Sequence, residues 1–345
     1  MSIHLAAVSL PAAYLAAAIA LAPAVGHAGD GALAATAQAL AVAEAEHGKA
    51  SPLLLPVLDR LAQQEARGGA LAKAASLRRR ALQIAVAGFG CDAAPAARAM
   101  LSLGLIEIDR RRYLDAEPML ILAQRVLAAA PEPDKAAMAA ISAGLARIAL
   151  ARGEPAEAEH WARRAIATSR KRHNTPSEAL RALAAALTAQ HRDAEAERLL
   201  NAALAQDRRG SDDVATARTL SELANLRLRE KRPRAALPLI EEATALDQTG
   251  LGPAHPFIAD DLYDLGLVYA ALHRQAAARR AFVATMAVLE RGGGRNTPRF
   301  AYAQLELSRL DRERGDAADA DALYRDARRI LNKAEAEEHR RERKV

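Results

Sequence analysis

The stretch Leu251–Arg291 reads LGPAHPFIADDLYDLGLVYAALHRQAAARRAFVATMAVLER. A proline-containing turn comes first, and an apolar segment that contains Leu265 and Gly266 follows it. After a short break, a second apolar segment is centred on Ala278. Apolar residues that recur at intervals of about three and four predict amphipathic helices, so the stretch is interpreted as one helix–turn–helix unit. The loop Gly252–Pro256 is interpreted as a connector between units, with no chemistry of its own.

The rest of the chain repeats this unit. Steps of 38 to 42 residues from Ala278 reach an alanine each time. These anchor alanines are Ala74, Ala116, Ala158, Ala196, Ala236, Ala278 and Ala320. A leucine precedes every anchor by 13 residues, and Gly, Ala or Ser precedes it by 12. A small residue on the first helix lets the second helix cross closely. The pattern predicts an all-α solenoid of stacked antiparallel helix pairs.

The composition agrees with this fold class. Hydrophobic residues make up 51% of the 345 residues but aromatic residues only 3%, so alanine and leucine must build the core. The enrichment in aromatic and β-branched residues that marks strands is missing. The net charge of +6 is spread along the chain in arginine doublets and triplets, which indicates solvated helix faces rather than a nucleic-acid site.

These repeats resemble the tetratricopeptide repeat family. Tyr269, Ala278, Phe282 and Thr285 give the fullest match, and the 42-residue spacing is similar to the kinesin-light-chain-like subtype. The resemblance covers about residues 53–334. It implies a right-handed superhelix and a bacterial exported protein that is a non-catalytic scaffold for proteins or peptides.

The register divides the chain into an N-terminal capping helix within residues 29–52, seven repeats and a charged tail at residues 335–345. The repeats are expected at about residues 53–94, 95–132, 133–175, 176–211, 212–254, 255–296 and 297–334.

Residues 1–28 contain no Lys, Arg, Asp or Glu, and residues 5–25 are almost wholly apolar. Small residues at Gly26 and Ala28 fit a cleavage site, so we expect a signal peptide and a periplasmic or secreted protein. An uncleaved inner-membrane anchor is the alternative, and the membrane is a partner only in that case.

No phosphate-binding loop, zinc-protease, nucleophile-elbow or paired Cys motif occurs in the sequence. We therefore expect no enzyme activity, no cofactor and no metal. A third reading keeps the protein in the cytoplasm as a regulatory or nucleic-acid-associated repeat protein.

The resemblance places the functional surface on the concave groove formed by the first helices. The predicted groove residues are Arg147, Arg181, Arg218, Asn225, Arg229, Tyr263 and Tyr302. Arginine binds carboxylates through two parallel hydrogen bonds, so the predicted partner is a protein or an acidic peptide. The alternative is that these arginines are solvated or pair with acidic residues of neighbouring helices.

Overall fold

The computed structural model describes residues 30–169 and 176–342, and these ranges contain 15 α-helices, one short 3-10 helix and no strand. The first helix, α2, spans Asp30–His47, and the 3-10 helix spans Pro52–Leu54. Seven helix pairs follow in this part of the chain. The pairs are α3 (Leu55–Arg67) with α4 (Leu71–Phe89), α5 (Ala94–Asp109) with α6 (Tyr113–Ala128), α7 (Lys135–Ala151) with α8 (Pro155–Ser169), α9 (Ser177–Ala189) with α10 (Asp193–Gly210), α11 (Asp213–Arg229) with α12 (Pro233–Gly250), α13 (Pro256–Ala271) with α14 (Gln275–Arg291), and α15 (Pro298–Arg314) with α16 (Ala317–Glu342).

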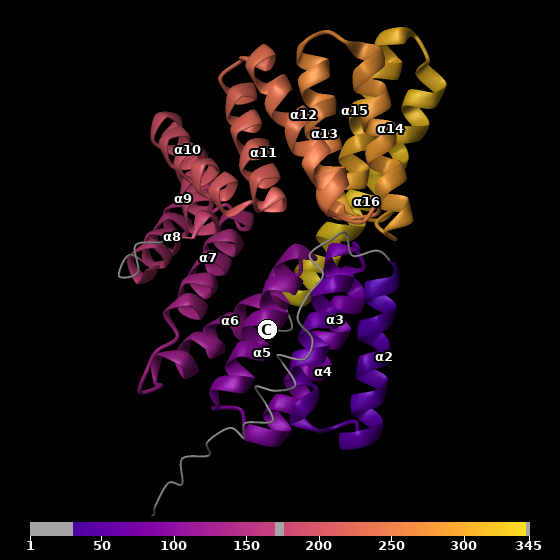
Figure 1. Ribbon diagram of the computed structural model, residues 1–345. Coiled ribbons are helices and arrows are strands. Elements are labelled where there is room, and N and C mark those ends of the chain that lie inside the picture. The colour runs from indigo at the N-terminus through magenta and orange to yellow at the C-terminus, as the bar shows by residue number, and fades with distance from the viewer. Residues whose placement is uncertain (1–29, 170–175, 343–345) are drawn as a thin grey trace, which may run out of the picture.

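Each pair packs on the next, so the array grows by stacking and confirms the predicted solenoid. The array is strongly curved (Figure 1): α2 to α6 form one group, α12 to α16 form a second group, and α7 to α11 join them along one side. The curvature brings the early and late pairs together.

The residues of the repeat register are the packing contacts. All seven anchor alanines are completely buried. A β-carbon at Gly104 would lie 2.8 Å from the Leu120 side chain, and one at Gly266 would lie 2.5 Å from the Phe282 ring. The small residue on the first helix is therefore needed for the close approach of its partner helix, as the sequence predicts.

The turns inside the helix pairs use a left-handed residue. Gly69, Gly153 and Gly315 have φ values of +85°, +75° and +92°, the left-handed conformation that glycine adopts readily at the end of a helix. Four other pairs place a non-glycine residue at this point; these residues are Arg111, His191, Lys231 and His273. The same backbone turn is thus made without glycine, at a modest cost in strain.

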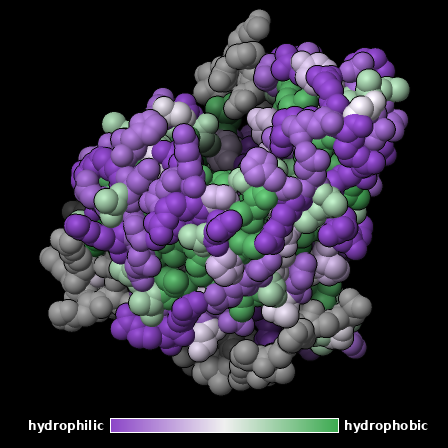
Figure 2. Space-filling model, turned by 90° about the horizontal axis from the view of Figure 1, so that it is seen from above, coloured by the Kyte–Doolittle hydropathy of each residue, from purple (hydrophilic) through white to green (hydrophobic). Residues whose placement is uncertain are grey.

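The face of the molecule shown in Figure 2 is mostly hydrophilic, with apolar residues in strips between polar ones. In residues 30–169 and 176–342, no helix combines the length and the apolar character needed to cross a bilayer. The predicted signal segment, residues 1–28, lies outside the described residues. The described part of the charged tail is helical, because α16 continues to Glu342.

The curvature ends in a direct backbone contact between the first pair and the loop before α13. The amide of Gly252 donates a hydrogen bond to the carbonyl of Arg67 at 2.9 Å. A β-carbon at Gly69 would lie 2.9 Å from backbone atoms of Ala254 and His255, so the two segments touch backbone to backbone. We call this contact, between Arg67–Gly69 and Leu251–His255, the closure contact. The loop Gly252–Pro256, which is predicted to be only a connector between units, therefore forms half of this contact.

A second contact runs beside it. The Arg111 guanidinium, at the turn between α5 and α6, lies 3.3 Å from both carboxylate oxygens of Asp260 on α13. Exposed ion pairs of this kind contribute little stability, whereas the glycine contact depends on shape and tolerates no added atom.

We predict that Gly69→Ala opens the array, because the new methyl group cannot fit against the Ala254 and His255 backbone. Gly153→Ala is the matched control: Gly153 has a similar φ of +75° but nothing within 4 Å of its missing β-carbon. Both variants lose about 1–2 kcal/mol to the left-handed conformation. Only Gly69→Ala should increase the radius of gyration in small-angle scattering at unchanged helix content. Equal radii for the two variants would contradict the closure contact.

Candidate functional site: the inner groove

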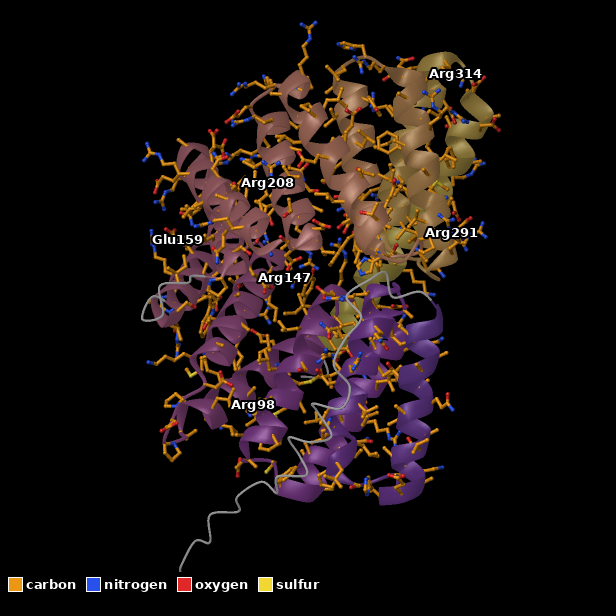
Figure 3. The ribbon with its side chains drawn as sticks, in the orientation of Figure 1. Arg98, Arg147, Glu159, Arg208, Arg291 and Arg314 are labelled. Atoms are coloured by element: carbon orange, nitrogen blue, oxygen red, sulfur yellow. The ribbon has the colours of Figure 1, made fainter. Side chains whose placement is uncertain are left out.

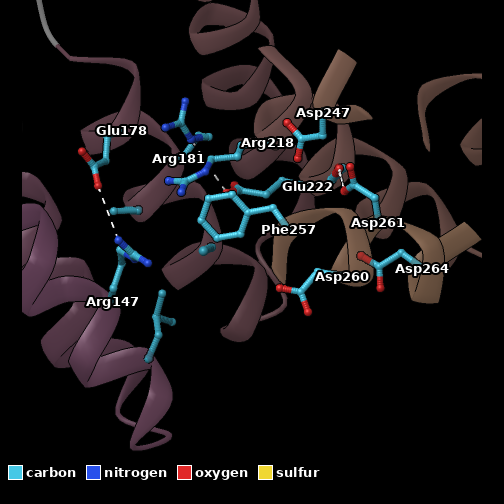
Figure 4. A pocket seen from close by; sticks show the side chains of 14 residues that line it. Arg147, Glu178, Arg181, Arg218, Glu222, Asp247, Phe257, Asp260, Asp261 and Asp264 are labelled. Atoms are coloured by element: carbon cyan, nitrogen blue, oxygen red, sulfur yellow. Dashed lines mark hydrogen bonds and ion pairs between the residues drawn. The ribbon is translucent and has the colours of Figure 1, made fainter. Parts of the chain in front are cut away.

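The inner face of the array holds a hollow of about 230 Å³, which we call the groove pocket (Figure 4). Its lining comes from α7, α9, α11, α12 and α13. The lining residues are Arg147, Leu150, Glu178, Arg181, Ala182, Ala185, Arg218, Ser221, Glu222, Asp247, Phe257, Asp260, Asp261 and Asp264. Three of the seven predicted groove residues, all arginines, thus meet in one pocket.

Arg147 is partly neutralised by the protein itself. It lies between the two groups of helices (Figure 3). Its guanidinium donates a 2.7 Å hydrogen bond to Asp109 and lies 3.7 Å from Glu178. Because 29% of its side chain is exposed, it still contributes positive charge to the pocket mouth.

Arg181 is a structural residue. It is only 7% exposed, and its Nη1 contacts Asp207, Thr219 and Ser177, each at 3.2 Å. Asp207 is itself buried and also accepts a 2.7 Å hydrogen bond from Thr219. Removing one partner of such a buried pair leaves an uncompensated charge, so Arg181 holds α9, α10 and α11 together.

Arg218 differs from both. Its guanidinium carbon lies 3.8 Å from the centre of the Phe257 ring, and it forms no ion pair with a carboxylate of the described residues. Its Nε has no hydrogen-bond acceptor. Burial lowers the pKa of this guanidinium. Arg218 is thus a cation held in place by an aromatic ring, with its charge unmatched.

The other four predicted residues lie outside the pocket lining. Asn225 donates a 2.8 Å hydrogen bond to Asp264, and Arg229 donates a 3.0 Å hydrogen bond to the Thr188 carbonyl. Tyr263 packs on Phe282 and lies under the Arg299 guanidinium, and burial raises its pKa to about 12. Tyr302 is 44% exposed on α15.

Six acidic residues that are not among the predicted groove residues also line the pocket. They are Glu178, Glu222, Asp247, Asp260, Asp261 and Asp264. Asp260 has its own cation, because Arg299 donates a 2.6 Å hydrogen bond to it. The register could have indicated the residues on α11 and α13. The register could not indicate Asp247, because this residue lies on α12, the second helix of its pair, whereas the groove was predicted to be formed by first helices.

Burial raises the pKa values of four of these acidic residues. It raises the pKa of Glu222 and of Asp247 to about 7 and that of Asp264 to about 6. Burial and then the neighbouring Asp247 charge raise the pKa of Asp261 to about 8. Asp247 and Asp261 are only 1% and 5% exposed, so they have little access to solvent.

The closure contact supports the pocket through His255. This imidazole is 4% exposed, hydrogen-bonds the Ala66 backbone and accepts the Phe257 amide at 3.1 Å, which caps α13. Burial, with Arg218 second, lowers its pKa to about 4, so it is neutral under ordinary conditions. Its ring centre lies 4.5 Å from that of Phe257. The first helix pair therefore helps to position the ring on which Arg218 rests.

The family model of the tetratricopeptide repeat matches residues 95–171, 176–249 and 216–291, which together make up more than half of the chain. The chain belongs to the tetratricopeptide repeat family. No curated protein matches the sequence. Among the described residues, no three His, Cys, Asp or Glu side chains are arranged to hold a metal ion.

Several solved structures are similar to this repeat protein. BtubC (BKLC) from P. vanneervenii is 16% identical with a TM-score of 0.48, over 65% of this chain and 93% of that chain. A Podosopora anserina putative kinesin light chain with TPR-like repeats is 22% identical with a TM-score of 0.45, over 56% and 94%. Pseudomonas aeruginosa pilF is 21% identical with a TM-score of 0.44, over 70% and 97%.

The raised pKa values predict a stability that falls as pH rises. Asp247 and Asp261 are protonated in the folded chain at a pH where they are ionised in the unfolded chain. Their stabilising effect is complete below about pH 4 and is lost as pH rises through about 7 to 8. Asp261→Asn should therefore gain about 2–4 °C in melting temperature relative to the wild type between about pH 5 and pH 8.5. Asp92→Asn, at an exposed position, is the control and should show no such gain.

Proposed function

We propose that this protein is a non-catalytic scaffold that binds an extended segment of a partner protein in its inner groove. Tetratricopeptide repeat proteins typically bind proteins or peptides. The observation that carries the proposal is Arg218, a cation in the groove pocket that rests on Phe257 and has no ion pair among the described residues. A guanidinium fixed in this way is preorganised for a carboxylate, which supports a partner with acidic character.

Arg218→Gln should weaken partner binding by about ten- to hundredfold, the loss expected for about 1.5–3 kcal/mol from one charge-assisted contact. Arg234→Gln is the matched control, because Arg234 is exposed and lies on α12 away from the groove pocket. Partners would be captured by crosslinking and their affinity measured with both variants. Arg181 and Asn225 are unsuitable, since both hold the protein's own helices. Equal binding by both variants would exclude the groove pocket as the binding site.

We also propose that the scaffold is exported by the charge-free apolar segment of residues 1–28, with the membrane-anchored form as the alternative. The sequence of this segment supports the proposal through its length, its apolar core and the small residues before Gly29. Mass spectrometry of the mature protein should find Gly29 at the N-terminus. Recovery of an intact N-terminus in the membrane fraction would favour the anchored form, and an intact soluble chain would favour the cytoplasmic one.

A further inference from the structure

The groove pocket has two walls of opposite charge. In Figure 4, Arg147, Arg181 and Arg218 lie on one side of the Phe257 ring, whereas Asp247, Asp261 and Asp264 lie on the other. Arg147 and Arg181 are each paired with a protein carboxylate, so Arg218 is the unmatched cation of the first wall.

We call the wall formed by Asp247, Asp261 and Asp264 the acidic wall, and it has few hydrogen-bond donors. Asp264 has the amide of Asn225 as its hydrogen-bond donor at 2.8 Å, and Asp261 has the hydroxyl of Ser221 at 2.6 Å. Neither is a cation. One oxygen of Asp261 and one of Asp247 have no donor when both groups are ionised, and these two buried carboxyl groups hydrogen-bond each other only when one of them holds a proton. Buried polar atoms are normally hydrogen-bonded, so this wall is short of hydrogen-bond donors.

These unmatched atoms are concentrated in the groove pocket. Nine buried side-chain nitrogen or oxygen atoms lack a partner in the described part of the chain, and four of them belong to pocket residues. The four are Arg218 Nε, Glu222 Oε2, Asp247 Oδ1 and Asp261 Oδ2. The pocket thus lacks an acceptor on one wall and donors on the other. A ligand with only carboxylates would satisfy one wall and repel the other.

We propose that the groove pocket binds a zwitterionic segment of the partner, in which a carboxylate contacts Arg218 and a nearby ammonium or guanidinium group contacts the acidic wall at Asp264. The order of the two charges fixes the direction in which the segment lies in the groove. Asp264 receives the cation because it is only half-buried, whereas Asp247 and Asp261 are almost completely buried and Glu222 lies 4.0 Å from the Arg181 guanidinium. The inference rests on the groove function proposed above and names the chemistry of the segment.

The raised pKa values agree with this arrangement. The carboxyl groups of the acidic wall hold protons, which lowers their negative charge. An incoming cation makes their ionisation favourable again. Binding should therefore release protons, an effect that a purely acidic ligand at Arg218 would not produce. Calorimetry in buffers with different ionisation enthalpies measures this release directly.

The probes are synthetic capped peptides in a Gly/Ser/Ala background that carry one Glu and one Lys, two Glu, or two Lys. Affinities would be measured by calorimetry for the full chain and for Arg218→Gln and Asp264→Asn. The amide in Asp264→Asn keeps an oxygen that can accept from Asn225, so the wall loses charge without losing shape. Arg234→Gln and Asp92→Asn are matched controls at exposed positions.

The mixed peptide should bind about tenfold or more tightly than either single-charge peptide, which corresponds to about 1.4 kcal/mol. Arg218→Gln should remove the preference over the Lys peptide, and Asp264→Asn the preference over the Glu peptide. Equal binding of the mixed and Glu peptides, unaffected by Asp264→Asn, overturns the zwitterionic proposal and leaves the groove function intact. No binding of any probe, or binding unaffected by Arg218→Gln, overturns both.

Discussion

One backbone hydrogen bond, from the Gly252 amide to the Arg67 carbonyl, joins the first helix pair of a curved array to the loop between the fifth and sixth pairs. It forms because neither Gly69 nor Gly252 has a β-carbon; such an atom would lie within 2.9 Å of the facing backbone in both cases. A solenoid normally has contacts only between neighbouring repeats, so its ends are free to move apart. Here the closure contact restrains that motion, and the groove has a defined width.

The closure contact also helps to position side chains of the groove pocket. His255 belongs to the closing loop and caps α13 by accepting the Phe257 amide. The Phe257 ring supports the guanidinium of Arg218 from the neighbouring pair. A residue of the first repeat thus influences the position of a side chain on the fifth. The closure contact, His255, Phe257 and Arg218 therefore form one connected set of contacts.

The fold was predictable because its determinants are local and repeated. A leucine beside a small residue recurs in every unit, and each copy requires the same close crossing, so chance agreement at one position does not matter. The groove arginines were predictable for the same reason, since the register assigns a face to each first-helix residue. Their roles were not predictable: Arg181 and Arg218 both lie on the groove face, yet only Arg181 is neutralised by Asp207 and hydrogen-bonded to Thr219. Such partners come from second helices and from later repeats, and a one-dimensional register does not place them.

The closure contact was not predictable because it depends on the sum of many small rotations between repeats. A minor change at each step would add up over the intervening helix pairs and move Gly252 far from Arg67. The loop Gly252–Pro256 consequently has the sequence of an ordinary connector, and only the completed curvature gives it a partner. The composition of the closing segments, with glycine at both points of contact, is compatible with such an approach but does not identify it.

The acidic wall lowers the stability of the folded chain. Buried carboxyl groups without cations cost free energy as soon as they ionise, and an apolar or amide side chain at Asp261 would avoid that cost. Sequences tend to break the rules of local consistency where a site needs an unfavourable group, and perturbed pKa values gather at such sites. The unmatched carboxyls lie beside the one groove arginine that is also unmatched, in the same hollow and across one aromatic ring. An unmatched cation and unmatched carboxyl groups in the same pocket are most simply explained by a single ligand that satisfies both.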